Sequence, residues 1–200
     1  YERSAELEAY CNLVDKYASL RLNEDISNGK PEHAVYLIAK LFDLAKEKVR
    51  LYSDHLEHKV QKADGTSVDL YGDENVLRHV ARFLRDPGRR LEVVIENDVE
   101  NIQAHPLFVR LDELDKDRNL LGRCEIRKII DPAKKWLSDS EFTNHFMISD
   151  DSASRVEVND NPESYAAQAN FGDSEKGKKL SNLFDNMHWK YAEPIKSWGL

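Results

Sequence analysis

The spacing of apolar residues predicts two helices in the first quarter of the chain. From Leu7 to Ala18, apolar side chains recur every three or four residues, which is typical of an amphipathic helix over 4–21. A second helix is expected over 31–47, because Pro31 suits the first turn of a helix. Its apolar stripe is wide, so we expect this helix to pack on a sheet.

Short apolar runs then alternate with helical patterns along the middle of the chain. We expect strands at 49–53, 91–95 and 124–130, in addition to a short strand or turn at 26–29. Residues 54–72 have the polar pattern of a loop or hairpin. Helices are expected after Asp73, a good N-cap, and from Pro106. Alternation of strand and helix requires crossover connections, so these strands should form a largely parallel sheet.

The last third of the chain has a different pattern. Two β-prone runs at 144–149 and 154–158 flank a polar turn at 150–152 and predict a hairpin. A final amphipathic helix is expected over 174–189. The predicted fold is therefore α/β, with a mixed, largely parallel β-sheet, helices on both faces and an extra N-terminal helix. The residues expected in its core are Val35, Ile38, Phe42, Leu51, Leu77, Val80, Phe83, Val93, Ile95, Ile126, Phe146, Ile148, Leu183 and Phe184.

Length and composition indicate the number of domains and the cellular compartment of the protein. Its 200 residues, 40% of them hydrophobic, suit one domain, and no apolar run is long enough to span a membrane. Cys11 and Cys124 lie in apolar patterns and are interpreted as buried free thiols, which suits a reducing compartment. With no signal-peptide pattern at the start, we expect a cytoplasmic protein that does not associate with membranes.

Charge gives a mixed indication about partners. The net charge of −8 opposes non-specific binding to nucleic acid or anionic lipid. Basic residues nevertheless gather within 78–90 and 123–135, while acidic residues dominate 96–117 and 139–163. Solvated helix and strand faces explain these groups most simply, although a local basic face remains an alternative.

Several common catalytic and binding motifs are absent. The chain has neither a glycine-rich phosphate loop nor a G-x-S-x-G elbow, and its two cysteines do not have zinc-ribbon spacing. His55 and His58, with Asp54 and Glu57 beside them, could hold a metal ion, but we interpret this polar stretch as a solvated loop. No metal or cofactor is therefore expected. His33, His79 and His188 are placed on helices as surface or half-buried residues, and His105 at a helix entry.

The segment 143–150, Thr-Asn-His-Phe-Met-Ile-Ser-Asp, resembles the H-x-K-x4-D motif of the phospholipase D superfamily. In this alignment Thr143 stands at the histidine position and His145 at the lysine position, whereas Asp150 keeps the aspartate. The motif is therefore degenerate.

Two downstream features support the same resemblance. Residues 167–171, Ala-Gln-Ala-Asn-Phe, are similar to the Gly-Ser-x-Asn-Phe run of the family, with Asn170 at the asparagine. The final amphipathic helix also fits the family's ending, so the resemblance covers roughly 26–189. It implies a phospholipase D-like domain over 26–200, preceded by a helix over 1–25 that serves as a linker or dimerisation arm.

The resemblance implies a chemistry that this chain has lost. In the family, the histidine attacks phosphorus, the lysine neutralises the phosphoryl oxygens, and two motifs meet across a two-fold axis. Thr143 is a weak nucleophile without an activating base, and His145 carries positive charge only when protonated. We therefore expect a vestigial site of Thr143, His145, Asp150 and Asn170, in which Thr143, His145 and Asn170 bind a ligand together with Ser53.

The function expected from this comparison is a non-catalytic binding, regulatory or assembly module. Its ligand would be a phosphorylated molecule or a nucleic-acid end. A single motif implies a homodimer, and a protein partner could bind through 1–25 or 139–163. Two alternatives stay open: a phosphodiesterase or nuclease with a rearranged active site, and a structural subunit of a larger complex with a filled pocket.

Overall fold

The computed structural model describes residues 4–54, 56, 59–61, 65–97, 100–118, 120, 122–130, 144–158 and 166–198. Thr143, His55 and His58 lie outside these residues, as does much of 139–163.

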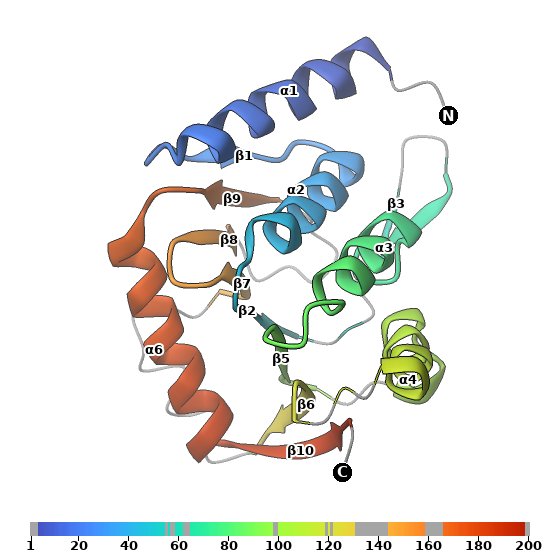
Figure 1. Ribbon diagram of the computed structural model, residues 1–200. Helices are drawn as coiled ribbons and strands as arrows, with labels where there is room; N and C mark the ends of the chain where they lie inside the picture. The colour runs from blue at the N-terminus through green and yellow to red at the C-terminus, as the bar shows by residue number, and fades with distance from the viewer. Residues whose placement is uncertain are drawn as a thin grey trace.

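The centre of the molecule is an eight-stranded sheet with the order β1-β9-β8-β7-β2-β5-β6-β10 (Figure 1). Its strands are β1 (Ile26–Ser27), β2 (Lys48–Ser53), β5 (Arg90–Ile95), β6 (Cys124–Ile129), β7 (Phe146–Ser149), β8 (Ala153–Glu157), β9 (Ala167–Asn170) and β10 (Ala192–Ser197). A separate hairpin of β3 (Lys59–Gln61) and β4 (Ser67–Asp69) lies within the segment expected to be a loop or hairpin.

The sheet is mixed, as expected, but its parallel part is smaller than the sequence suggested. β2, β5 and β6 pair in parallel, in agreement with the helical crossovers between them. The other described ladders are antiparallel, and β1 pairs with β9 instead of joining the parallel strands. The reason is that the tail forms a tightly connected hairpin, β7–β8, which enters the sheet beside β2 and can only continue antiparallel.

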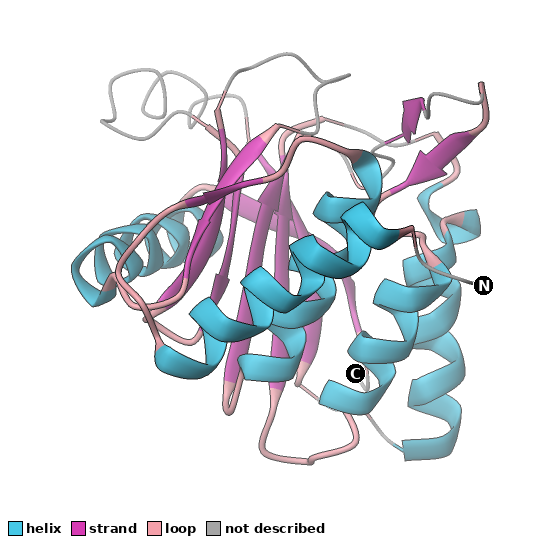
Figure 2. Cartoon of the chain, turned by 90° about the horizontal axis from the view of Figure 1, so that it is seen from above, coloured by secondary structure: helices cyan, strands magenta, loops and turns pink. Residues whose placement is uncertain are grey.

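Helices cover both faces of the sheet (Figures 1 and 2). On one face lie α2 (Pro31–Leu44), α3 (Glu74–Phe83) and α4 (Pro106–Arg118), the last preceded by the short 3-10 helix η1 (Ile102–Ala104). On the other face lies α6 (Ser174–Lys190), which packs its apolar side on strand residues such as Tyr52 and Phe146. The α/β architecture predicted from the sequence is therefore confirmed.

The N-terminal helix α1 (Ala5–Leu20) packs on α2 rather than standing apart. Its Cys11, Val14 and Ala18 are buried, and Val14 and Ala18 belong to the same hydrophobic cluster as α2 and the sheet. Cys11 and Cys124 are free buried thiols, as expected. Among the described residues, no helix combines the length and apolar character that a membrane crossing requires.

The core agrees closely with the sequence, whereas two histidines do not. All fourteen predicted core residues are buried. His33 and His188, however, were expected at or near the surface and are buried instead. His33 stacks on Tyr10 with the ring centres 3.7 Å apart, and His188 lies 3.1 Å from Glu125. Each ring is therefore covered by a neighbouring element that the helical pattern alone could not place.

Candidate functional site

One edge of the sheet gathers polar residues from four strands. Asp54 and Glu96 directly follow β2 and β5, which are parallel neighbours and end together. His145 directly precedes β7, and Glu157 is the last residue of β8. Because β7 runs antiparallel to both β2 and β8, its start lies beside their ends. The backbone N–H of Glu157 donates to the His145 carbonyl at 2.9 Å.

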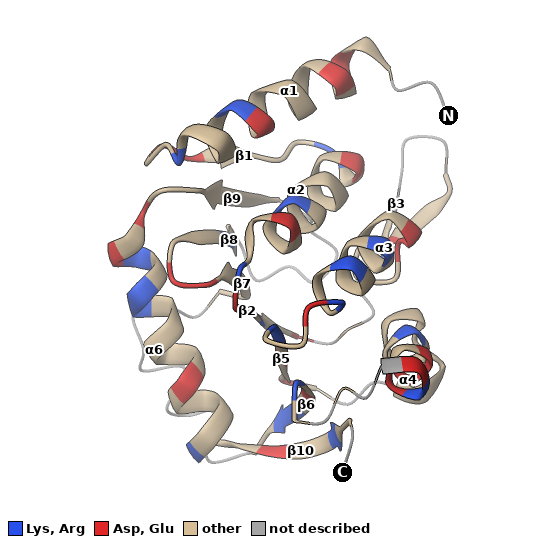
Figure 3. Ribbon diagram, viewed as in Figure 1, with Lys and Arg blue, Asp and Glu red and all other residues tan. Residues whose placement is uncertain are grey.

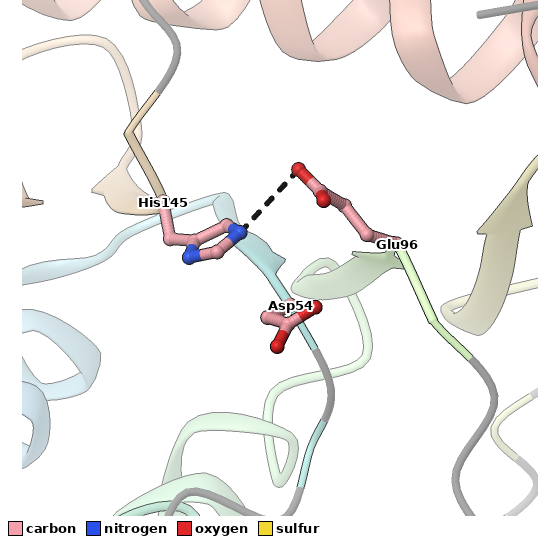
Figure 4. Close-up of side chains that lie close together, drawn as sticks. All are labelled: Asp54, Glu96 and His145. Carbon is pink, nitrogen blue, oxygen red and sulfur yellow. Dashed lines mark ion pairs between the residues drawn. The ribbon is translucent and has the colours of Figure 1, made fainter. Parts of the chain in front are cut away.

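The imidazole of His145 lies between two carboxylates. Its Nδ1 is 3.4 Å from Glu157 Oε2, and its Nε2 is 3.4 Å from Glu96 Oε1 (Figure 4). The edge of the Tyr52 ring packs against it, with the ring centres 5.1 Å apart. The strand ends therefore hold the imidazole in one position.

This environment sets the charge of His145. Burial alone would lower the pKa of the imidazole, but the carboxylates of Glu157 and Glu96 outweigh burial and raise the pKa to about 9. His145 is therefore protonated at neutral pH. Its positive charge is paired with the carboxylates of Glu96 and Glu157 on either side of the ring.

The carboxylates are in turn held by their own neighbours. Arg155, which is almost fully buried, places Nη1 3.3 Å from Glu157 Oε1. The Tyr52 hydroxyl donates to Glu96, and the Asn97 side-chain amide donates to Asp54. These contacts fix the orientation of each acid at the strand ends.

Asp54, Glu96 and His145 together form a set of metal-ligating side chains. Each offers one ligand atom, and these atoms all lie within 4.8 Å of one another. All three are half-buried and come from three different segments of the chain (Figure 4). The sequence interpretation expected no metal site and missed this arrangement.

Asp150, the retained aspartate of the motif, lies at the opposite edge of the sheet. It follows β7, so the length of this strand separates it from His145, by roughly 16 Å for five residues of extended chain. Its carboxylate accepts the backbone N–H groups of Lys46, Glu47 and Lys48 at 3.0, 3.0 and 2.9 Å. Asp150 thus ties the turn after β7 to the loop before β2.

Asn170 also lies at that opposite edge, where β9 ends. Its side-chain oxygen accepts the N–H groups of Gly172 and Asp173, and its amide donates to Asn23 and Asp25. These bonds shape the entry to α6. The structure therefore does not bring Asn170 or Asp150 next to His145, contrary to the expectation of one shared pocket.

A cavity of about 190 Å³ lies beside Asp150, with Arg21, Lys46 and Phe171 in its lining. It is at the far edge from His145. Ser53, the remaining expected ligand residue, ends β2 at the His145 edge, where it is buried and hydrogen-bonded to Tyr71. Of the expected site residues that the structure describes, Ser53 and His145 lie at one edge, and Asp150 and Asn170 lie at the other.

A signal for the missed residues was present in the sequence. Asp54 and Glu96 each follow a predicted strand of the parallel set, and the carboxyl ends of parallel strands meet at one edge, where sites in α/β proteins commonly lie. Glu157 could not be found in this way, because its position depends on the register of the β7–β8 hairpin.

Comparison by sequence finds no matching family model and no matching curated protein. Comparison of structures gives matches at low identity. TrmBL2, an archaeal chromatin protein described as showing a novel mode of DNA binding, has a TM-score of 0.51 and 15% identity, over 96% of this chain and 62% of its own.

Two further solved structures are similar to this chain. Phosphatidylserine synthase of Haemophilus influenzae Rd KW20 has a TM-score of 0.52 and 12% identity, over 86% of this chain and 40% of its own. NucT of Helicobacter pylori has a TM-score of 0.51 and 11% identity, over 86% of this chain and all of its own. The chain thus spans less than two thirds of TrmBL2 and of the synthase.

At these identities the likeness concerns the fold alone. The synthase and NucT belong to the phospholipase D superfamily. The architecture of this chain is therefore consistent with a phospholipase D-like fold.

Proposed function

We propose that this chain is a non-catalytic phospholipase D-like module for binding or assembly. The observation that carries the proposal is the environment of His145, which occupies the lysine position of the motif. Carboxylates face both of its ring nitrogens at 3.4 Å. Its positive charge is thereby neutralised within the protein.

The electrostatics of the site argue against phosphoryl transfer. That reaction depends on fixed positive charge around the phosphoryl oxygens. Among the described residues of this site, Asp54, Glu96 and Glu157 contribute three carboxylates, and His145 and Arg155 contribute two cations. A bound phosphodiester would therefore meet a net negative charge from these described side chains, which opposes its binding.

Enzyme assays test this proposal. The purified chain is incubated with bis(4-nitrophenyl) phosphate, phosphatidylcholine vesicles, and single- and double-stranded DNA, each with EDTA or with Mn²⁺. We expect no hydrolysis above the buffer rate. Hydrolysis that His145→Ala abolishes would overturn the proposal, provided that His79→Ala retains it. His79 is a suitable control because it pairs with Asp43 on α2, far from the site in sequence and fold.

Self-association belongs to the same proposal, since a single motif per chain implies a two-fold partner. β7 is hydrogen-bonded to β2 on one side and β8 on the other, so a second copy could not pair with it edge to edge. Contact would involve the His145 end of the strand or another surface, including 1–25 or 139–163. Analytical ultracentrifugation across micromolar concentrations should give a dimer; a monomer throughout would remove this part of the proposal.

DNA binding is a second candidate function, favoured by the likeness to TrmBL2 and by exposed arginines on and after α3, namely Arg78, Arg82 and Arg85. Acidic residues are interspersed with basic ones over the helices (Figure 3), which limits the attraction. A gel-shift titration at two salt concentrations tests it. Binding that weakens in an Arg78→Gln, Arg82→Gln, Arg85→Gln variant would support DNA binding at this surface, and no shift at low salt would exclude it.

A further inference from the structure

The metal-ligating set at the sheet edge has a chemistry that goes beyond the proposed function. We propose that Asp54, Glu96 and His145 bind a divalent first-row transition-metal ion, of the Zn²⁺ or Mn²⁺ class, with one ligand atom from each residue. The inference rests on the same side chains as the proposed function, and a bound dication would offset part of their negative charge.

The spacing of the ligand atoms fits such an ion. In tetrahedral sites with metal–ligand distances of about 2.1 Å, neighbouring ligand atoms are about 3.4 Å apart. Nε2 of His145 and Oε1 of Glu96 are already 3.4 Å apart, and all three ligand atoms lie within 4.8 Å of one another. Closure around an ion therefore needs movement on the order of 1 Å by half-buried carboxylates.

A second observation comes from His145 itself. Its Nε2 is buried and makes no hydrogen bond of good geometry to any residue that the structure describes. Buried polar atoms in native proteins normally have a partner, and a missing partner commonly indicates an ion or a water molecule. Nε2 points toward Glu96, on the side where the Asp54 carboxylate also lies (Figure 4).

The neighbours of the three ligands form a supporting arrangement. Metal-bound imidazoles usually direct their second ring nitrogen at a carboxylate, which fixes the ring and its tautomer. Glu157 occupies that place, 3.4 Å from Nδ1, and Arg155 holds it. The Tyr52 hydroxyl and the Asn97 amide orient Glu96 and Asp54.

The donor atoms also select the class of ion. One imidazole with two carboxylates favours a borderline ion such as Zn²⁺ over Ca²⁺ and Mg²⁺, which prefer oxygen alone; Mn²⁺ is a harder ion that the two carboxylates suit. The carboxylates of Asp54 and Glu96 attract a dication; on binding, Nε2 would release any proton to solvent and hold the metal, while Nδ1–H stays directed at Glu157. Three protein ligands leave at least one position for water or a bound molecule.

Titration of the chelator-treated, full chain with Zn²⁺, Mn²⁺ and Co²⁺ tests the site. Calorimetry should give one ion per chain, and bound Co²⁺ should absorb in the visible range. Asp54→Asn, Glu96→Gln and His145→Ala should each weaken binding at least tenfold, and Glu157→Gln by about ten- to a hundredfold through the orientation of the imidazole. His79→Ala, the matched control, should bind as the wild type does.

Three results would overturn the inference. One is an absence of binding at 100 µM ion; another is affinity unchanged in all three ligand variants. The third is loss of binding only in a His55→Ala, His58→Ala variant, which would assign the ion to that polar stretch. Circular dichroism and unfolding in EDTA check that each variant is folded. If a ligand variant does not fold, Glu157→Gln is compared with the wild type instead. The same Co²⁺ spectrum and the same affinity in these two proteins would also overturn the inference.

Discussion

The side chain of Arg50 connects several elements around the sheet. Its guanidinium on β2 contacts Asp151 at 3.1 Å, Ser181 at 3.1 Å and Asp185 at 3.3 Å, thereby joining the β7–β8 turn and α6 to the sheet. The side chain is only 9% exposed. Burial alone would raise the pKa of Asp151, but the hydrogen bonds from Ser181 and Arg50 lower it overall, which indicates a favourable interaction with its carboxylate.

We expect Arg50→Met to lower the free energy of unfolding by about 1–3 kcal/mol, because Glu92, whose side chain is 11% exposed, loses a cation, whereas water screens much of the charge of the exposed Asp151 and Asp185. Urea unfolding followed by circular dichroism measures the loss. Arg82→Met is the control: Arg82 is 61% exposed and pairs with Asp43 at 3.6 Å, so its loss should have little effect. Equal losses of unfolding free energy in the two variants would show that the burial of Arg50 does not make its ion pairs more stabilising.

His188 makes stability depend on pH. Burial lowers its pKa, with a further contribution from Arg127, despite the nearby acids Glu92, Glu125 and Asp185. A histidine with a lowered folded pKa takes up its proton more readily in the unfolded chain, so its contribution is lost as pH falls below about 6.5. The neutral, folded form is favoured above that value.

The stability of the wild type relative to His188→Gln should therefore decrease between about pH 7 and pH 5. Urea unfolding of both proteins at several pH values tests this directly. Carboxylates that titrate in both proteins contribute nearly equally to each free energy of unfolding, so they largely cancel when the two free energies are subtracted. A difference that stays constant or grows on acidification would show that His188 is not held neutral.

At the scale of elements, α6 approaches the β7–β8 turn closely because it has a glycine at the contact. A Cβ added at Gly177 would lie 2.3 Å from the backbone oxygen of Asp151. Alanine is the better helix former, but neither the helix nor the turn can move without disturbing the sheet contacts on both sides.

We expect Gly177→Ala to destabilise the domain by about 1–3 kcal/mol through this clash. Gly29→Ala serves as the control, since a Cβ there would meet nothing within 4 Å and should be close to neutral. Thermal and urea unfolding of the two variants give the comparison. A stabilised Gly177→Ala protein would show that the helix simply shifts.

Most elements could be predicted from the sequence. The compositions of β9 and β10 explain why these two strands could not. The helices and β2, β5, β6, β7 and β8 have clear periodicity and matched the structure within a few residues. β9 was not recognised as a strand, because Ala167–Asn170 contains no strongly β-prone residue. β10 contains Pro194 and exposed charges, a composition tolerated only at the edge of a sheet.

At the scale of the whole molecule, α1 behaves as part of the folded core. Val14 is fully buried, while its neighbour Leu13 is 43% exposed. The helix therefore packs one side on the domain and exposes the other side. Substitutions at Val14 and Leu13 should distinguish a role of α1 in folding from a role as a linker or dimerisation arm.

Val14→Asp should lower stability by several kcal/mol, because it places a carboxylate in a hydrophobic cluster. Leu13→Asp should change stability by less than about 0.5 kcal/mol and instead weaken self-association if α1 is a dimerisation arm. Unfolding and ultracentrifugation of both variants distinguish these effects. Insensitivity to Val14→Asp would show that the helix is dispensable for the fold.

The candidate site illustrates the limit of sequence reasoning at this scale. His145 could be singled out because the motif resemblance covers its neighbours. Asp54, Glu96 and Glu157 lie far apart along the chain and meet only through the strand order. The motif also suggested that Asp150 and Asn170 share a pocket with His145, but residues before and after one strand lie at opposite edges of the sheet.

The insertion of the late hairpin β7–β8 beside the early strand β2 has a consequence for synthesis on the ribosome. The parallel strands β2, β5 and β6 emerge before β7, and the edge of β2 that pairs with β7 stays open until residues 146–149 have been made. An open edge of buried, apolar strand attracts other chains. A nascent chain of this protein therefore exposes the edge of β2 in the interval between the synthesis of β2 and that of β7, when chaperone binding would matter most.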